Sequence, residues 1–101
     1  MKGALPVVFE RRAAREVEEI DEWWRINRTA APNLFTLELE QSLRIVQAAP
    51  ALGAPARSVR LPGVRRVLMR RTRYYIYYRL AGDRLDVLAV WHTSRGAGPD
   101  L

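Results

Sequence analysis

VRLPGVRRVLMRRTRYYIYYRLAGDRLDVLAVWH, residues 59–92, is the stretch of the sequence that decides the fold. It contains three short apolar segments, Val67–Met69, Tyr74–Leu80 and Leu85–Trp91, which are rich in β-branched and aromatic residues. Segments of this length and composition are typical of β-strands. Gly82-Asp83 separates the last two segments, and a Gly-Asp pair in that position favours a tight hairpin turn. We therefore predict a three-stranded antiparallel meander.

The central segment alternates between two kinds of position. One parity holds Tyr74, Ile76, Tyr78 and Leu80, and the other holds Arg73, Tyr75, Tyr77 and Arg79. Because successive side chains of a strand point to opposite faces, this pattern indicates one face in a core and one face in water. We expect the second set, the two arginines together with Tyr75 and Tyr77, to lie on the exposed face.

The N-terminal half predicts a short strand at Leu5–Phe9, with Pro6 near its start, followed by two amphipathic helices. The first helix begins near Glu10 and ends around Asn27; the second runs from Pro32 to about Ala48. The predicted core-facing residues are Ala13, Val17, Ile20 and Trp24 in the first helix, and Phe35, Leu39, Leu43 and Val46, broadened by Leu34 and Leu37, in the second. We expect the indole of Trp23 at the edge of its stripe, where its N–H can find a partner.

The predicted order is β-α-α-β-β-β. This order implies an α+β fold of two layers, with a helical hairpin packed on one face of a small, mainly antiparallel sheet. The segment Ala49–Pro62 is predicted to be a loop, because it is rich in Pro, Gly and Ala. We expect one domain over residues 1–101, with a flexible tail at about 96–101.

Composition excludes several classes of protein. There is no cysteine and only one histidine, so we expect no disulfide framework, no metal site and no cofactor. No apolar run approaches the roughly 20 residues that span a bilayer. The N-terminus, MKGALPVVFERR, lacks the features of a signal peptide. We expect a cytoplasmic protein with no membrane partner.

Positive charge is concentrated in the second half of the chain. Residues 1–56 carry seven Lys/Arg and eight Asp/Glu, whereas residues 57–101 carry ten Arg and three Asp. Sixteen of the seventeen basic residues are arginine, which recognises carboxylate and phosphate groups bidentately and stacks on aromatic rings. This asymmetry indicates an anionic partner that meets one face of the protein. A genome-wide preference for arginine codons explains the choice of Arg over Lys equally well, but not the clustering.

The ordered set of these segments resembles the RelE/ParE toxin family. VVFERRAAREVEEIDEWW, residues 7–24, looks like the opening of the family: a strand ending in Phe, then a helix with early Ala and a Glu-Glu-Ile turn. The resemblance continues through Pro50, Leu52-Gly53, Gly63-Val64-Arg65-Arg66, YYIYYR at Tyr74–Arg79 and VLAVWH at Val87–His92. It covers about residues 5–95.

The resemblance implies the toxin of a type II toxin–antitoxin system, a class associated with plasmid stabilisation and growth arrest. A cognate antitoxin encoded beside the toxin holds such proteins inactive. ParE-like members block DNA gyrase by binding it, whereas RelE-like members cut mRNA in the ribosomal A site. We expect the antitoxin's toxin-binding segment to be acidic and apolar, and to fold across the helices and the arginine-rich sheet.

Two sets of residues follow from these two activities. Metal-free RNA cleavage needs an acid, a base and cations, and the candidates are His92, Arg65, Arg73 and Tyr75. A histidine after a strand is more often a hydrogen-bonded residue at the end of a sheet, and tyrosines at strand spacing more often pack. For binding of the target or antitoxin, the candidates are Arg65, Arg66, Arg70, Arg71, Arg73, Arg79, Trp23 and Trp24.

We favour the ParE-like, binding-only interpretation, because the sequence offers few acid–base groups. The loop Ala51–Ser58 contributes only Arg57, and Thr93 and Ser94 follow His92. A third alternative is a basic nucleic-acid-binding module without toxicity, whose mark is strongly salt-dependent binding of nucleic acid.

Overall fold

The computed structural model describes residues 4–58 and 60–101. Val59 of the quoted stretch and residues 1–3 of the N-terminal segment tested for a signal peptide lie outside the described residues. In chain order the elements are β1 (Val7–Phe9), α1 (Arg11–Asn27), α2 (Leu34–Ala48), the 3-10 turn η1 (Pro50–Leu52), β2 (Ala54–Pro55), β3 (Arg65–Met69), β4 (Tyr74–Ala81), β5 (Arg84–His92) and the 3-10 turn η2 (Thr93–Arg95).

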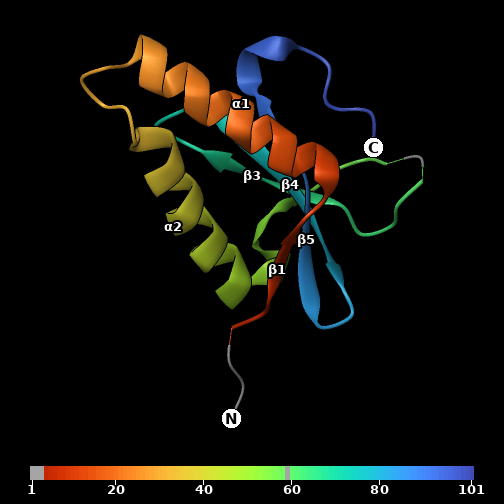
Figure 1. Ribbon diagram of the computed structural model, residues 1–101. Helices are drawn as coiled ribbons and strands as arrows, with labels where there is room; N and C mark the ends of the chain where they lie inside the picture. Colours follow the sequence, from red (N-terminus) through yellow and green to blue (C-terminus); the bar gives the residue numbers. More distant parts are fainter. Residues whose placement is uncertain (1–3, 59) are drawn as a thin grey trace.

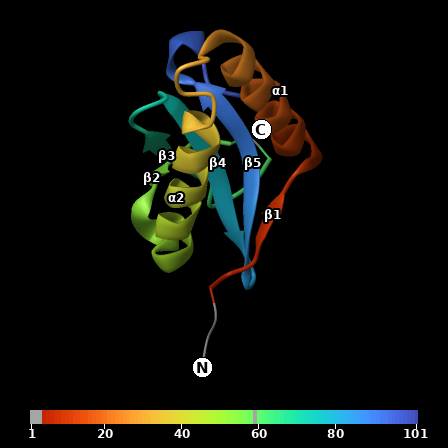
Figure 2. The same ribbon diagram turned by 60° about the vertical axis from the view of Figure 1, so that its left-hand side comes forward.

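The strands form one sheet in the order β1-β5-β4-β3-β2. β1 runs parallel to β5, and every other neighbouring pair is antiparallel. Both helices lie on the same face of this sheet, as Figures 1 and 2 show from two directions. The predicted two-layer α+β fold with a helical hairpin on one face is therefore confirmed. None of the helices in the described part of the chain has the length and apolar character needed to cross a membrane.

The meander forms as predicted. β4 and β5 are joined by a two-residue turn closed by the pair Ala81–Arg84, and Gly82 has φ +63°, which a residue without a Cβ adopts without strain. β5 has one extra residue, Leu88, between the pairs Tyr77–Ala89 and Tyr78–Val87. This β-bulge places both Leu88 and Ala89 on the sheet face away from the helices.

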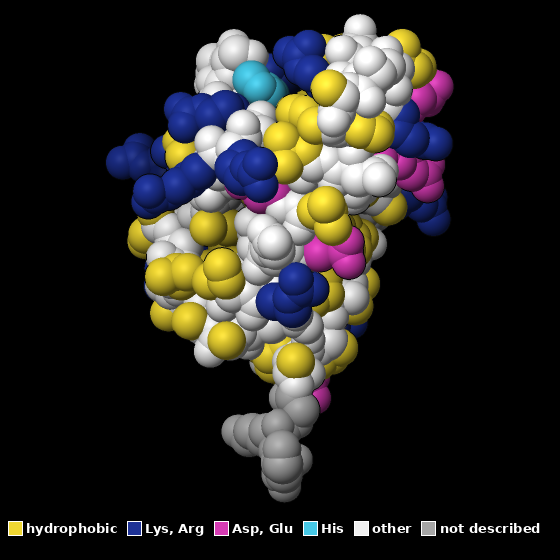
Figure 3. All heavy atoms as spheres, turned by 90° about the vertical axis from the view of Figure 1, so that its left-hand side faces the viewer, with side chains coloured by type: hydrophobic (Ala, Val, Ile, Leu, Met, Phe, Trp, Pro, Cys, Tyr) yellow, Lys and Arg dark blue, Asp and Glu magenta, His cyan; other side chains and the backbone are white. Residues whose placement is uncertain are grey.

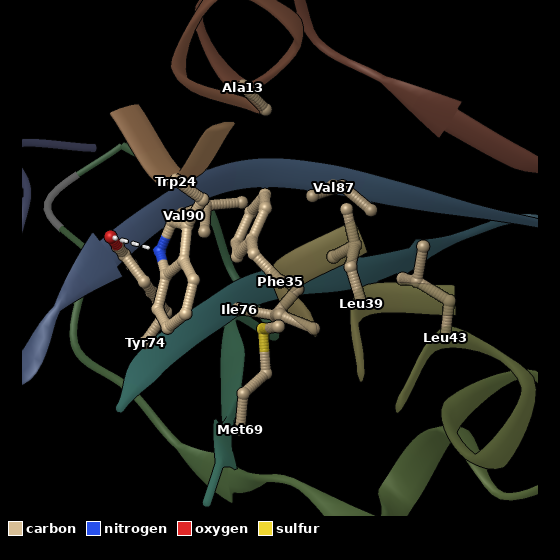
Figure 4. Packing of buried hydrophobic residues seen from close by; sticks show 10 residues of the cluster. All are labelled: Ala13, Trp24, Phe35, Leu39, Leu43, Met69, Tyr74, Ile76, Val87 and Val90. Atoms are coloured by element: carbon tan, nitrogen blue, oxygen red, sulfur yellow. Dashed lines mark hydrogen bonds between the residues drawn. The ribbon is translucent and has the colours of Figure 1, made fainter. Parts of the chain in front are cut away.

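The core lies between the helices and the sheet (Figure 4). Its buried residues are Ala13, Trp24, Phe35, Leu39, Leu43, Met69, Tyr74, Ile76, Val87 and Val90. Apart from Leu37, the predicted core stripes of both helices are thus confirmed: Val46 is buried in a neighbouring cluster, and Val17, Ile20 and Leu34 pack at the margin. The buried indole N–H that finds a partner belongs to Trp24, not Trp23: its Nε1 donates to the hydroxyl of Tyr74 at 3.4 Å.

Three predictions about the helices and strands were wrong. α2 begins at Leu34, because Pro32 lies in a turn in which Leu34 N–H donates to the carbonyl of Ala31. Leu37 is 55% exposed, because a step of two residues turns about 200° around a helix and so places Leu37 on the side opposite to the buried Phe35. The two-residue strand β2 falls within the predicted loop; its pairing with β3 depends on the tertiary fold, not on a local pattern.

The outer face of the sheet is covered more than we predicted. Val64, Tyr77, Leu88 and Ala89 form a second buried cluster there, with Ala56, Leu61, Tyr75, Trp91 and Leu101 packed against it. Alternation identifies this face, but it does not reveal that the chain after β2 returns across it. The expected exposure of Tyr77 was therefore wrong.

The C-terminal segment also lies against this face. Arg12 Nη1 donates to the carbonyl of Asp100 at 2.8 Å, and Ser58 Oγ donates to the carbonyl of Leu101 at 3.2 Å. The flexibility expected of residues 96–101 and the single-domain organisation stay predictions.

A buried carboxylate fixes the turn between β3 and β4. Glu38 of α2 is 8% exposed, and it accepts hydrogen bonds from Arg71 N–H at 2.8 Å, Thr72 N–H at 2.9 Å and Thr72 Oγ1 at 2.7 Å. Burial acts to raise the pKa of Glu38, but these hydrogen bonds and the charge of Arg71 outweigh it and hold the pKa below its ordinary value. Glu38 therefore ties α2 to the end of the meander.

We expect Glu38→Gln to lower the free energy of unfolding by about 2 kcal/mol at neutral pH, since an amide cannot accept all three hydrogen bonds. Glu40→Gln, on the exposed side of the same helix, is the matched control and should change stability by less than about 0.5 kcal/mol. Urea unfolding of the three proteins measures both effects.

The Glu38 contribution should depend on pH in one direction. Because the folded-state pKa lies below the unfolded-state value, the carboxylate stabilises the fold above its ordinary pKa. That stabilisation is lost as the pH falls through the folded-state pKa. The gap between wild type and Glu38→Gln should therefore narrow in acid; a gap that widens as the pH falls contradicts this account.

Candidate functional site

An open groove lies between α1 and the ends of the central strands. We call it the α1 groove; its volume is about 750 Å³. It is lined by Glu16, Glu19, Ile20, Trp23, Trp24, Arg28, Arg71, Thr72, Arg73, Tyr74, Val90, His92, Ser94 and Arg95. The groove therefore joins the C-terminal half of α1 to the β3–β4 turn and to the end of β5.

Tryptophan and arginine side chains stack on one wall of the α1 groove. Trp23 is 44% exposed, while Trp24 is buried, and their rings meet edge to face at 5.9 Å between centroids. The guanidinium of Arg28 lies 5.1 Å from the ring centroid of Trp23 and 5.9 Å from that of Trp24. Such cation–π contacts hold the guanidinium in place at the mouth of the groove.

The opposite side of the α1 groove is cationic. Arg71 and Arg73 extend from the β3–β4 turn and Arg95 from η2, next to His92. Figure 3 shows arginine side chains gathered near the single histidine on this side of the molecule. In the described part of the chain, the ion pairs are Arg12–Glu16, Arg25–Asp21 and Arg84–Asp86. Two acids of α1, Glu16 and Asp21, thus pair within their own helix, and none of these ion pairs engages an arginine of the groove.

Arg73 is held in an unusual backbone conformation. Its φ is +70°, and it is the one described residue other than glycine with a positive φ. Its N–H donates to the carbonyl of Met69 at 2.8 Å, and its carbonyl accepts from Thr93 N–H at 2.9 Å. Glycine or asparagine is usual at such a position, so an arginine there suggests that its side chain serves a function.

His92 caps the 3-10 turn that follows β5. Its Nδ1 accepts a hydrogen bond from Ser94 N–H at 3.1 Å and lies 2.7 Å from Ser94 Oγ. Because Nδ1 accepts from a backbone N–H, the ring carries its proton on Nε2. The ring also meets Tyr74 edge to face at 4.8 Å. This geometry is that of a hydrogen-bonded residue at the end of a sheet.

The structure does not bring the candidate nuclease residues together. Arg73 shares the α1 groove with His92, but Arg65 lies at the far end of β3, where its Nη1 donates to the carbonyl of Gly53 at 2.7 Å. Tyr75 lies on the outer face of the sheet, under the guanidinium of Arg66 at 4.2 Å.

The candidate binding residues are likewise divided. Trp23, Trp24, Arg71 and Arg73 line the α1 groove. Arg70 lies on the other side of the β3–β4 turn, and Arg66 lies on the outer face, with its Nη1 donating to Tyr77 Oη at 3.3 Å. Arg79 lies on β4, and its Nε is buried without a hydrogen-bond partner among the described residues. One continuous arginine face, as the sequence suggested, is therefore absent from the described part of the chain.

Sequence reasoning missed two arginines of the α1 groove as binding residues. Arg28 follows Trp24 by four positions, the spacing that places two residues on one side of a helix, and this signal was available. Arg95 reaches the groove only because η2 turns the chain after His92. No local pattern predicts that turn.

Comparison with known proteins gives a family and a fold. Residues 7–96 match the family described as "ParE toxin of type II toxin-antitoxin system, parDE". A solved chain described as "Chromosomal ParDE TA system from P. aeruginosa" superposes with a TM-score of 0.69 at 18% identity, covering 88% of this chain and 96% of that chain. At that identity the likeness shows the fold alone. No curated protein matches the chain.

We expect Arg73→Gly to raise the free energy of unfolding by roughly 0.5–1 kcal/mol, because glycine adopts a positive φ without strain. Arg73→Ala removes the same charge but keeps the Cβ, so it should stay close to wild type. Urea unfolding of both variants separates backbone strain from the loss of charge. If the glycine variant is less stable than the alanine variant, the backbone at this position is not strained.

Proposed function

The chain belongs to the ParE toxin family of type II toxin–antitoxin systems, and from this premise we propose that it inhibits DNA gyrase by binding it. The single observation that carries the proposal is the family match over residues 7–96. We further propose that a cognate antitoxin neutralises it and that it acts in the cytoplasm, where gyrase is found. Growth arrest follows if no antitoxin is present.

The α1 groove supports an activity that depends on binding alone. An exposed tryptophan beside stacked arginines is a common composition for the energetic centre of a protein interface. Trp23 offers apolar area, and Arg28, Arg71 and Arg73 offer charge-assisted hydrogen bonds to carboxylates on a target. In this proposal the groove is the gyrase-binding surface.

One observation favours the mRNA endonuclease as a second candidate. His92 shares an open groove with Arg71, Arg73 and Arg95, and cations near a histidine could stabilise the charge that develops on a cleaved phosphate. Two observations oppose the nuclease. His92 Nδ1 already accepts a hydrogen bond from Ser94 N–H, and Arg65 and Tyr75 lie outside the groove. The groove therefore supports anion binding better than acid–base catalysis.

A supercoiling assay with purified DNA gyrase tests the main proposal. Wild-type protein in excess should stop supercoiling, and Arg71→Glu/Arg73→Glu should weaken inhibition roughly 10-fold or more, because two attractive contacts become repulsive. Arg15→Glu/Arg57→Glu reverses as many charges at exposed positions outside the groove and should inhibit about as well as wild type. Unimpaired supercoiling at excess wild-type protein removes the gyrase proposal.

Growth after induction in cells without the antitoxin tests the nuclease alternative. If His92 is the acid or base, His92→Gln should lose growth arrest while its circular dichroism spectrum stays that of wild type. Binding-only inhibition predicts growth arrest without new mRNA ends, whether or not His92→Gln, which lies in the groove, weakens that arrest. Mapping of mRNA ends in the same cells gives an independent readout, since a ribosome-dependent nuclease leaves cuts within codons and a gyrase inhibitor does not.

A further inference from the structure

His92 and Ser94 make a contact that the proposed function does not use. Both residues line the α1 groove, and Ser94 Oγ lies 2.7 Å from His92 Nδ1. Because Nδ1 accepts a hydrogen bond from Ser94 N–H, it carries no proton, so the hydroxyl is the donor in this contact. A hydroxyl that donates to a ring nitrogen at roughly 2.6–3.2 Å has the geometry of a nucleophile beside its base.

Among the described residues, Ser94 is the one serine placed in this way. The sequence has a single histidine, and its other serines, Ser42 and Ser58, lie outside the α1 groove. Ser94 is also exposed, so a reactant in solution can reach its hydroxyl. The contact that opposes a nuclease role for His92 therefore prepares Ser94 for attack on an electrophile.

Cations outnumber acids in the described lining of the α1 groove. It holds four arginines and two glutamates: Arg28, Arg71, Arg73, Arg95, Glu16 and Glu19. The carboxylate of Glu16 already accepts hydrogen bonds from Arg12 Nε at 3.2 Å and from Val90 N–H at 3.0 Å. Guanidinium groups stabilise the charge of phosphoryl oxygens during transfer, and Figure 3 shows arginine side chains beside the histidine. The groove therefore favours an electrophile that carries a phosphoryl group.

The same residues limit the leaving group. His92 can take a proton from the hydroxyl, but the arginines do not give one up, because a guanidinium stays charged in proteins. A leaving group that must gain a proton, such as the sugar oxygen of a cleaved RNA, is therefore poorly served. A carboxylate leaves without a proton, since carboxylic acids ionise well below neutral pH. The matching donor is an acyl phosphate, in which a phosphoryl group is joined to a carboxylate oxygen.

We propose that Ser94 is a phosphorylation site that takes its phosphoryl group from an acyl phosphate. Ser94 Oγ attacks the phosphorus, and the hydroxyl proton passes to His92 Nδ1. The Oγ–P bond forms as the bond between phosphorus and the acyl oxygen breaks, and the carboxylate leaves with that electron pair. His92, then protonated on both nitrogens, returns one proton to water.

The product suits its surroundings. A phosphoserine adds about −1.5 to −2 units of charge and three acceptor oxygens, which arginine side chains recognise. Arg95 is the next residue, and its guanidinium is stacked 3.6 Å from the ring centroid of Trp91. The modification goes beyond gyrase inhibition and does not depend on it, because it needs only this chain and the donor.

Acetyl phosphate, a small acyl phosphate, is the probe that tests the proposal. After incubation with the chain, intact-mass spectrometry should show the gain of one phosphoryl group. Peptide mapping should place that group on Ser94, with Ser42 and Ser58 unmodified in the same molecules. Ser94→Ala should gain no mass, whereas Thr93→Ala, which removes the neighbouring hydroxyl of η2, should be labelled at the wild-type rate.

A histidine variant separates the base from the cap of η2. His92→Asn keeps a side-chain oxygen that can accept from Ser94 N–H, as asparagine does at N-caps, but an amide does not take up the proton. We expect its labelling to slow by roughly 100-fold or more, the usual contribution of a general base. Circular dichroism and thermal unfolding establish that the variant is folded; if it is not, the arginine variants below decide.

Two pairs of arginine substitutions test the stabilisation of the phosphoryl group. Arg71→Ala/Arg73→Ala should slow labelling by roughly 10-fold or more, because two cations are lost from the groove. Arg15→Ala/Arg57→Ala removes as many charges at exposed positions outside the groove. This control pair should be labelled at the wild-type rate.

Every outcome counts for or against the proposal. A phosphoryl group on Ser94, slowed by His92→Asn and by the groove arginine pair, supports it. No gain of mass, labelling of another residue, an acetyl group in place of the phosphoryl group, or a folded His92→Asn labelled at the wild-type rate overturns it. Labelling by ATP and Mg²⁺ but not by acetyl phosphate overturns the donor class. The readout is mass, so a failed supercoiling assay leaves this result readable by itself.

Discussion

The hydrogen bonds of Glu38 hold the β3–β4 turn, whose residues line the α1 groove and a second groove between α2 and β3. Three arginines stand within the four residues from Arg70 to Arg73, so the β3–β4 turn concentrates like charges that repel one another. A buried carboxylate beneath the turn offsets part of this repulsion and satisfies two backbone N–H groups as well. The hydrogen bonds come from backbone and threonine donors, so they fix the turn while the guanidinium groups stay free to contact a partner.

The same turn separates the two grooves and connects them. Arg71 lines the α1 groove, Arg70 lines a second groove of about 610 Å³ between α2 and β3, and Arg73 lines both. A ligand held by Arg73 in one groove therefore changes the charge presented to the other.

The features of the fold that could be predicted from the sequence are those that depend on short-range patterns. Alternation in β4, the Gly82-Asp83 turn and the helical stripes around Trp24 and Phe35 all report on neighbours within a few residues, and the structure has them. The role of Glu38 could not be predicted, because its partners Arg71 and Thr72 lie more than thirty residues away. The division of the arginines has the same cause: alternation separates the faces of β4, but only the tertiary fold shows which face the chain after β2 covers.

Stacking gives a physical reason for arginine in this chain, beyond any preference of codon usage. Arg28 lies over Trp23, Arg66 lies 4.2 Å from the ring centroid of Tyr75, and Arg95 lies 3.6 Å from that of Trp91. A planar guanidinium stacks on a ring and keeps its N–H groups directed outward, which an ammonium group does not do. Long side chains lose rotamer freedom when they bind, and a stacked side chain has already lost part of it. The aromatic rings thus hold these arginine side chains in fixed positions before a partner binds, which lowers the entropy that binding costs.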